Sequence, residues 1–329
     1  MTTTSPTIRI EKNGGPDEMK LVDLPVGEPG PGEIRIRHHA CGINFIDVYQ
    51  RSGVYTLPMP LTLGMEGAGI VEAVGAGVTH LKAGDRAAYA ANPPGSYSLA
   101  RVMPARNVCK LPDAISFETG ASMMLKGLTA QYLLRRALPQ EGLVPGDHVL
   151  FHAAAGGVGL IACQWARAIG VTMIGTVSTD EKAEIVKANG CTHTIVTGRE
   201  DIAKRVRELT DGKGVPVVYD SVGKDTLAAS LDSLQVRGHL VSNGTSSGPV
   251  VIDTMQLAVK GSIWVTRPAM MHYIMPRSHM LAMADELFGH VLAGRITGEP
   301  KQQFALADAA DAHRALESRK TVGATVLVP

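Results

Sequence analysis

Apolar and polar residues alternate in short runs along roughly the first 125 residues, a spacing that favours strands buried on one face. Runs of this kind cover residues 7–10, 19–24, 33–38, 68–74 and 86–90. Glycine and proline separate them, most densely over residues 27–32, where turns are expected. The pattern predicts a β-rich domain in the N-terminal part of the chain.

The rhythm changes near residue 127, after which short apolar runs alternate with segments of helical spacing. Asp180 is the expected N-cap of the second helix. Strands that alternate with helices of this length predict a parallel, doubly wound sheet, and therefore an α/β fold. A helix over 279–293 and a strand over 324–328 follow, and we expect the C-terminal part to complete the β-rich domain. The expected central strands are 149–153, 172–177, 194–196, 215–220, 238–242 and 262–266, and the expected helices are 157–169, 180–188, 201–209 and 226–234.

Composition narrows the possible functions. The 329 residues give room for about two domains. The 32 basic and 31 acidic residues leave a net charge of +1, so nucleic acid and membrane surfaces are not expected partners. Four scattered cysteines show no CxxC pair, which favours free thiols in a cytoplasmic protein. We expect neither a signal peptide nor a membrane span.

A glycine-rich turn lies between the first expected central strand and its helix. Ala154, Gly156 and Gly159 occupy the frame G-x-G-x-x-G, with Gly157 and Val158 between the last two. Glycine lets a pyrophosphate approach the backbone, and the helix N-terminus offers N–H donors to it. The turn therefore predicts a dinucleotide site, the alternative being a glycine-rich turn that binds no ligand.

The end of the second expected strand indicates which dinucleotide binds. NAD sites usually carry an acid there for the ribose 2′-hydroxyl. Here Ser178 and Thr179 follow the strand and Lys182 comes soon after, which favours the 2′-phosphate of NADPH. Two alternatives stay open: Lys182 is an ordinary solvated lysine, or Asp180 and Glu181 weaken the preference.

Several stretches together resemble a known family. They are Phe-His-Ala-Ala-Ala-Gly-Gly-Val-Gly over 151–159, Gly-Ile-Asn-Phe-Ile-Asp over 42–47, Leu-Lys-Gly-Leu-Thr-Ala over 125–130 and Val-Tyr-Asp-Ser-Val-Gly over 218–223. The chain resembles the zinc-free NADPH:quinone oxidoreductases, the zeta-crystallin-like branch of the medium-chain dehydrogenase/reductase superfamily.

The resemblance implies two domains with a cleft between them. A GroES-like catalytic domain is expected over residues 1–126, completed by 268–329, and a Rossmann NADP-binding domain over 127–267. The resemblance also implies a homodimer, in which the last Rossmann strand, near residues 262–266, pairs across subunits.

Zinc-bearing relatives hold their catalytic metal with cysteine and histidine. The matching positions here are Asn44, Met65 and Lys126, which do not form a ligand set suited to zinc. We therefore expect no metal, and an acceptor that takes hydride unaided.

The resemblance also implies a set of cofactor contacts drawn from both domains. Close bacterial relatives carry a tyrosine at the position of Thr197, where it helps to hold the adenosine phosphate, so this chain lacks one such contact. The expected cofactor residues are Asn44, Phe45, Asp47, Tyr132, Gly156, Gly157, Val158, Gly159, Ser178, Thr179, Lys182, Val222, Asn243, Ser246, Arg267 and Arg319.

The expected acceptor site follows the stretch that contains Asn44. Tyr49, Arg51 and Tyr55 are candidates, with Asn44, for the catalytic rim around a quinone, the alternative being ordinary loop residues. The predicted function is metal-independent reduction of quinones, or of another small electrophilic acceptor, by NADPH. The alternatives are a reductase of enone or alkenal double bonds, and a cofactor-binding protein with a structural or RNA-binding role.

Overall fold

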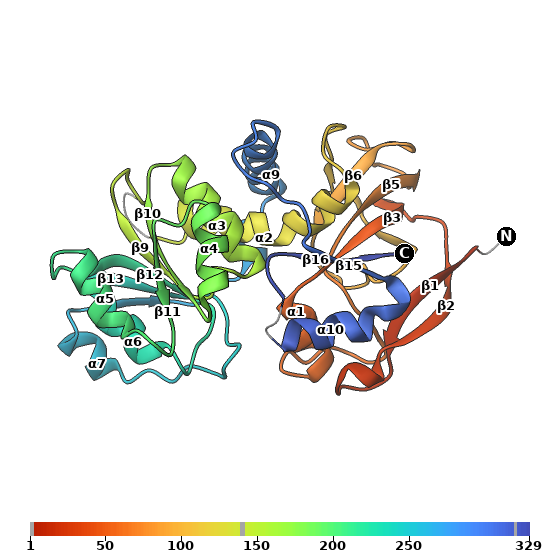
Figure 1. Ribbon diagram of the computed structural model, residues 1–329. Helices are drawn as coiled ribbons and strands as arrows, with labels where there is room; N and C mark the ends of the chain where they lie inside the picture. The colour runs from red at the N-terminus through yellow and green to blue at the C-terminus, as the bar shows by residue number, and fades with distance from the viewer. Residues whose placement is uncertain (1–2, 139–141, 319–320) are drawn as a thin grey trace. The chain divides into compact units, whose positions relative to one another are not determined.

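The computed structural model describes residues 3–138, 142–318 and 321–329. The backbone divides into two compact units, coloured by residue number in Figure 1. Residues Met1–Leu128 and Arg277–Pro329 form the terminal unit, and Thr129–Pro276 form the central unit. The expected α/β fold with one β-rich and one doubly wound domain is confirmed.

The central unit is built on a six-stranded sheet in the order β11-β10-β9-β12-β13-β14, and every neighbouring pair is parallel. Strands β10 and β11 are added on one side of β9, whereas β12, β13 and β14 are added on its other side. The direction in which the sheet grows therefore reverses between β9 and β12. In sheets of this kind ligands bind beyond the carboxyl ends of the strands at such a reversal. The elements are β9 (His148–Phe151), α3 (Gly157–Ala168), β10 (Thr172–Val177), α4 (Asp180–Ala188), β11 (His193–Val196), α5 (Ile202–Leu209), β12 (Val215–Asp220), α6 (Leu227–Ser233), β13 (Leu234–Ser242), α7 (Thr254–Val259), β14 (Trp264–Thr266) and α8 (Met270–Tyr273).

Buried aliphatic side chains join these strands into one core. Leu150, Ile174, Ile195, Val218 and Leu240 come from β9 to β13, one from each strand, and all are buried. Burial on both faces explains why the strands read as short apolar runs. One local expectation was wrong: Thr179, not Asp180, is the N-cap of α4, because its hydroxyl oxygen accepts from the backbone N–H of Lys182 at 3.3 Å.

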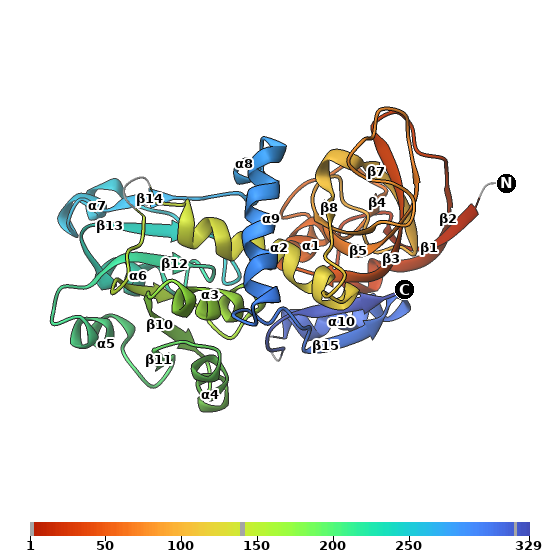
Figure 2. The same ribbon diagram turned by 90° about the horizontal axis from the view of Figure 1, so that it is seen from above.

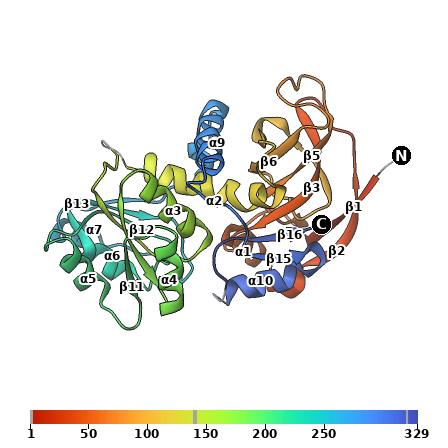
Figure 3. The same ribbon diagram turned by 45° about the horizontal axis from the view of Figure 1, so that its top comes forward.

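The terminal unit contains two sheets, and the C-terminus completes one of them. Strand β16 pairs antiparallel with β3, beside which it lies in Figure 3, so the C-terminal part completes the β-rich domain as the sequence predicts. The smaller sheet has the order β2-β1-β4, and the larger has the order β15-β16-β3-β5-β6-β8 with β7 also paired to β3. The strands are β1 (Thr3–Ile10), β2 (Lys20–Val26), β3 (Glu33–Ile43), β4 (Leu61–Thr62), β5 (Glu66–Val74), β6 (Arg86–Ala90), β7 (Ala100–Pro104), β8 (Cys109–Lys110), β15 (Gln302–Ala305) and β16 (Thr325–Val328); the helices include α9 (Arg277–Leu292) and α10 (Ala309–Glu317).

Helices α1 (Phe45–Ser52), α2 (Phe117–Arg135), α7, α8 and α10 of the described residues were not expected from the sequence pattern. Helix α1 follows β3, and α2 is labelled in Figure 2. Met123, Met124 and Leu128 of α2 are all buried, so the helix shows no polar stripe that would reveal its period. No helix in the described ranges is long and apolar enough to cross a membrane.

The division into units differs in detail from the expected boundaries. The structure divides the chain after Leu128 and after Pro276, whereas the sequence suggested residues 126 and 267. Helix α8 stays with the central unit, where Tyr273 stacks on Tyr132 with ring centroids 4.4 Å apart. Tyr132, an expected cofactor contact, is buried in this stack.

A neutral histidine lies in the core of the terminal unit. The ring Nδ1 of His38 lies 2.7 Å from the Ser98 carbonyl oxygen, an acceptor only, so Nδ1 carries the proton. Its Nε2 then accepts from the Tyr89 hydroxyl at 2.8 Å. Burial lowers the pKa of His38 to about 3.

Acid should therefore destabilise the fold through His38. The ordinary pKa of an unfolded histidine is about 6.5, so the stability that neutral His38 contributes is complete above that pH and is lost as pH falls toward 3. We expect the advantage of the wild type over His38→Asn in unfolding free energy to shrink by about 1.4 kcal/mol per pH unit below pH 6.5. Urea unfolding at pH 7.5, 6 and 5 measures it. The matched control is His279→Asn on the exposed surface of α9, and a pH-independent difference for His38→Asn would contradict the assignment.

Candidate functional site

The glycine turn opens helix α3 as the sequence predicts. Gly156 is the N-cap, and its lack of a side chain leaves the first N–H groups of the helix without a side-chain cap, while Gly157 and Val158 begin the helix. A Cβ on Gly159 would lie 2.4 Å from the carbonyl oxygen of Ala154, so close helix–strand packing requires glycine there. The turn therefore fits an anionic group at the helix N-terminus.

A buried network of hydrogen bonds lies next to this turn, at the carboxyl ends of the central strands. Ser230 Oγ donates to Asp220 Oδ2 at 2.7 Å and lies 3.0 Å from His152 Nε2, so Nε2 carries the ring proton. Nδ1 of His152 then accepts from the Thr176 hydroxyl at 3.2 Å. Burial lowers the pKa of His152 and keeps the ring neutral. The network ties the carboxyl ends of β9, β10 and β12 together.

The expected adenosine end lies where β10 runs into α4. Ser178 and Thr179 are exposed there, and Lys182 lies in the first turn of α4. No acid stands directly after β10, but Asp180 and Glu181 are exposed in the same helical turn. The hydroxyls and the lysine that the sequence singles out thus share one edge of the sheet.

The other expected cofactor residues of the central unit follow β12 and β13. The backbone N–H of Val222 donates to Asp220, and that of Ser246 donates to Ser221 at 3.3 Å. Arg267 Nη1 donates to the Gly244 carbonyl at 2.7 Å and so braces the loop after β13.

One atom of this loop is unsatisfied. The side-chain oxygen of Asn243 is buried and has no hydrogen-bond partner among the described residues. A buried acceptor without a donor is costly, and a hydroxyl or amide of a bound nucleotide would satisfy it. Asn243 therefore fits the expected cofactor.

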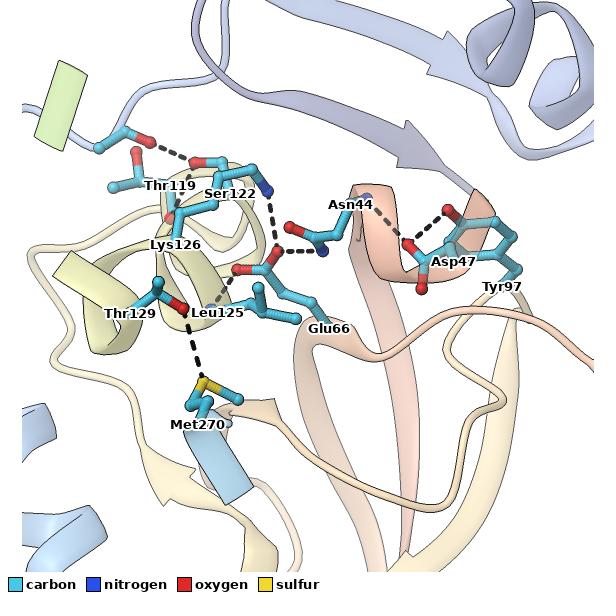
Figure 4. Close-up of polar contacts among 11 residues, drawn as sticks. Asn44, Asp47, Glu66, Tyr97, Thr119, Ser122, Leu125, Lys126, Thr129 and Met270 are labelled. Atoms are coloured by element: carbon cyan, nitrogen blue, oxygen red, sulfur yellow. Dashed lines mark hydrogen bonds and ion pairs between the residues drawn. The ribbon is translucent and has the colours of Figure 1, made fainter. Parts of the chain in front are cut away.

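In the terminal unit a buried carboxylate gathers three donors (Figure 4). Glu66 Oε2 accepts from Asn44 Nδ2 at 2.9 Å and from Lys126 Nζ at 3.0 Å. Glu66 Oε1 accepts from the backbone N–H of Leu125 at 2.7 Å. The side chains of Glu66 and Lys126 are 0% and 6% exposed, so this ion pair is shielded from water.

Asn44, Met65 and Lys126 are the residues that the resemblance implied in place of a metal-ligand set. Asn44 and Lys126 meet on Glu66, while the Met65 sulfur accepts from Gln50 Nε2 at 3.4 Å. The described part of the chain contains no group of three or more histidine, cysteine, aspartate or glutamate side chains arranged to hold a metal. Lys126 instead brings a fixed positive charge to this place.

Asp47 is buried next to this cluster. Its Oδ2 accepts from the backbone N–H of Asn44 at 2.8 Å and from the Tyr97 hydroxyl at 2.9 Å. Its Oδ1 is buried without a partner among the described residues. Burial raises the pKa of Asp47 to about 7. Asp47 fixes the start of α1, and the structure gives it no exposed face for the expected cofactor contact.

Arg51 is linked to Asp47 by hydrogen bonds through His313 and Tyr97. Its guanidinium donates to His313 Nδ1 at 3.0 Å, to Glu317 Oε1 at 2.8 Å and to the Gly14 carbonyl at 3.1 Å. His313 Nε2 in turn lies 3.0 Å from the Tyr97 hydroxyl. Arg51 is 2% exposed, so the geometry does not support its expected place at the acceptor rim. The expectation treated this segment as a loop, whereas it is a helix packed on α10.

The aromatic candidates form a row along α1 and the turn after it. Phe45 and Tyr49 are half-buried with ring centroids 6.2 Å apart, and Tyr49 and Tyr55 meet edge-on at 5.4 Å. Tyr55 is 41% exposed. The row fits an apolar wall with hydroxyl groups. Arg319, the remaining expected contact, lies outside the described residues.

Sequence reasoning missed several residues of these networks, among them Glu66, Tyr97 and His313. Glu66 carried a signal, because an acid inside an apolar, glycine-rich run at 63–69 needs buried partners. Tyr97 and His313 are 216 residues apart and carried none.

Comparison with known proteins assigns both parts of the chain. Residues 30–145 match the family model of the alcohol dehydrogenase GroES-like domain. Residues 157–286 match the family model of zinc-binding dehydrogenases.

Individual relatives match nearly the whole chain. A quinone oxidoreductase of Pseudomonas aeruginosa is 53% identical over 98% of this chain and 99% of its own length. A 2-haloacrylate reductase of a Burkholderia species is 45% identical over 97% of this chain and 98% of its own. The crystal structure of Escherichia coli quinone oxidoreductase complexed with NADPH superposes with a TM-score of 0.96 at 46% identity, covering 99% of this chain and 100% of that one.

The pair of Glu66 and Lys126 should couple strongly in stability. Breaking a buried ion pair from one side leaves a lone buried charge, at a cost of about 3–5 kcal/mol. We expect Glu66→Gln and Lys126→Met each to destabilise by about that amount, and the double variant to recover much of the loss. Urea unfolding of all four proteins measures the coupling.

The matched control is Lys187→Met, which breaks the exposed pair between Lys187 and Glu184 on α4 and should change stability little. Strictly additive losses for the buried pair would show that Glu66 and Lys126 act independently.

Proposed function

Since this chain belongs to the quinone oxidoreductases of the medium-chain dehydrogenase/reductase superfamily, we propose that it reduces quinones with NADPH and without a metal ion. The observation that carries the proposal is the glycine turn at Gly156–Gly159 followed by a β10 end that lacks the acid of NAD sites. In the net reaction, NADPH, a quinone and one proton give NADP⁺ and a hydroquinone.

When bound, NADPH supplies the hydride, and the chain's own residues bind and orient it. The N–H groups at the start of α3 hold the pyrophosphate, with Gly156 admitting it to the backbone. Ser178, Thr179 and Lys182 hold the 2′-phosphate at the end of β10. Asn243 accepts a hydrogen bond from the ribose or carboxamide with its unsatisfied oxygen.

The acceptor side needs orientation and one proton. A quinone is an electrophile that takes hydride without a Lewis acid, so the Asn44–Glu66–Lys126 cluster supports metal-independent reduction. Tyr49 and Tyr55 supply the apolar wall, and a tyrosine hydroxyl or water supplies the proton.

Reduction of an activated carbon–carbon double bond is the second candidate. It is supported by the 2-haloacrylate reductase of the Burkholderia species, which is 45% identical over nearly the whole chain. The chemistry is similar, because an electron-poor alkene also accepts hydride without a metal when its neighbouring carbonyl is oriented.

Four free, buried cysteines support a cytoplasmic location as part of the proposal. Disulfides are rare in reducing compartments, where buried thiols persist. The cysteines are Cys41, Cys109, Cys163 and Cys191.

We further propose that the protein is a homodimer paired along the edge of β14. Trp264 and Val265 of this edge strand are 54% and 38% exposed. Val236 and Val259 nearby are 72% and 83% exposed. An apolar edge strand next to exposed valines is costly in water unless another chain covers it, and a second copy would extend the sheet.

Turnover on different acceptors tests the function. We expect NADPH-dependent reduction of a benzoquinone to exceed that of an enone or a 2-haloacrylate, and NADH to support much slower turnover. A chelator should leave the rate unchanged. Turnover on the alkenes alone would favour the second candidate, and loss of activity under the chelator would refute metal independence.

Light scattering on a sizing column tests the dimer. We expect the wild type to have twice the chain mass of 34.7 kDa and Trp264→Glu to have the mass of one chain, because a buried carboxylate at the interface is costly. The matched control is Leu292→Glu on α9, whose side chain is equally exposed at 54%. A monomeric wild type, or a dimeric Trp264→Glu, would contradict the proposed interface.

A further inference from the structure

Arg199, in the turn after the neighbouring strand β11, contacts Asp180 at the start of α4, just beyond β10. Strands β10 and β11 are parallel partners, with Val177 opposite Val196, so the residues that follow them lie side by side. Arg199 Nη2 donates to Asp180 Oδ1 at 2.8 Å, and Nη1 donates to Oδ2 at 2.9 Å. Helix α4, which begins at Asp180, lies beside β11 in Figures 1 and 2.

This ion pair changes the electrostatics at the expected 2′-phosphate position. An unpaired Asp180 carboxylate would repel a phosphate held by Ser178 and Thr179. The Arg199 guanidinium neutralises that carboxylate, and the hydrogen bonds lower the pKa of Asp180. The negative charge of Asp180, which the sequence suggested would weaken NADPH binding, is therefore balanced by Arg199.

Thr197 takes no part in binding a phosphate here. Its hydroxyl and its backbone N–H both donate to the Val177 carbonyl, at 3.1 Å and 2.8 Å. The Thr197 side chain is thus committed to the backbone. Arg199 is the cation on the same loop, two residues further along.

A guanidinium has five N–H donors in a plane. The carboxylate of Asp180 takes one edge, through Nη1 and Nη2. The edge formed by Nε and Nη2 has the fork geometry that binds phosphate oxygens in pairs.

We propose that Arg199 binds the 2′-phosphate of NADPH directly, while it holds Asp180, and that it determines the preference for NADPH over NADH in this chain. The proposal rests on the proposed use of NADPH. It assigns to Arg199 the phosphate contact that Thr197 does not make.

Equilibrium binding to the full chain tests this, with NADPH and NADH and with the fragments 2′,5′-ADP and 5′-AMP. Arg199→Ala should weaken NADPH and 2′,5′-ADP binding about tenfold, as expected for loss of a charge-assisted hydrogen bond at an exposed site. The binding of NADH and 5′-AMP, which lack the 2′-phosphate, should change less than about twofold. The matched control is Arg205→Ala, which breaks the exposed pair of Arg205 with Glu208 and should leave all four ligands unchanged.

Asp180→Asn separates direct contact from charge compensation. If Arg199 touches the phosphate, Arg199→Ala combined with Asp180→Asn stays weak for 2′,5′-ADP. Recovery of the double variant to wild-type affinity would show that Arg199 only neutralises Asp180, and would overturn the proposal.

The two levels of failure are distinguishable. A wild type that binds 2′,5′-ADP no better than 5′-AMP would refute the proposed NADPH site itself. A wild type that discriminates, together with an Arg199→Ala variant that discriminates equally, would refute only the role of Arg199. The Arg199 and Asp180 side chains are 61% and 67% exposed, so we expect their variants to melt at the same temperature as the wild type. Equal melting temperatures exclude misfolding as the cause of weaker binding.

Discussion

A carboxylate buried without water must find its full set of donors inside the protein, and in the terminal unit Glu66 imposes this constraint. Its donors come from the start of α1, through Asn44, and from the middle of α2, through Leu125 and Lys126. Strand β5, which begins with Glu66, therefore positions two helices with one side chain. Asn44 and Lys126, which come from different helical segments, are held together by this carboxylate.

A chain of hydrogen bonds from a buried histidine through a hydroxyl to a buried aspartate occurs in both units. In each unit a buried histidine stays neutral because burial disfavours its charged form, and it is connected through one hydroxyl to a buried aspartate. Each chain of hydrogen bonds then fixes a backbone segment that the proposed reaction uses: the start of α1 in one unit and the turn before α3 in the other. The two chains are His313–Tyr97–Asp47 and His152–Ser230–Asp220.

Sequence patterns predicted the strands β9 to β14 and the helices α3 to α6 of the central unit closely, because each strand there is a short apolar run and a helix follows each of the first four. The turn that opens α3 was also predictable, since the close approach of Gly159 to the Ala154 carbonyl demands glycine. The terminal unit was less predictable for two reasons. Helix α2 is buried on most sides, so its period is invisible, and Arg51 takes its role from Glu317, 266 residues away in the sequence. Contacts of that range leave no local pattern, so the sequence could not show that Arg51 and Asp47 are buried in hydrogen-bonded networks.

The pairing of β16 with β3 sets an order of events during synthesis. The central unit is one continuous segment, so it can fold as soon as it leaves the ribosome. The large sheet of the terminal unit lacks β16 until Thr325–Val328 have been made, and until then one edge of β3 near Ile43 has no strand beside it, while the other edge pairs with β5. The N-terminal half of the terminal unit, although translated first, is therefore completed last. A ribosome that stops short of these few residues releases a chain whose central unit can fold but in which Ile43, the residue before Asn44, lacks its β16 partner.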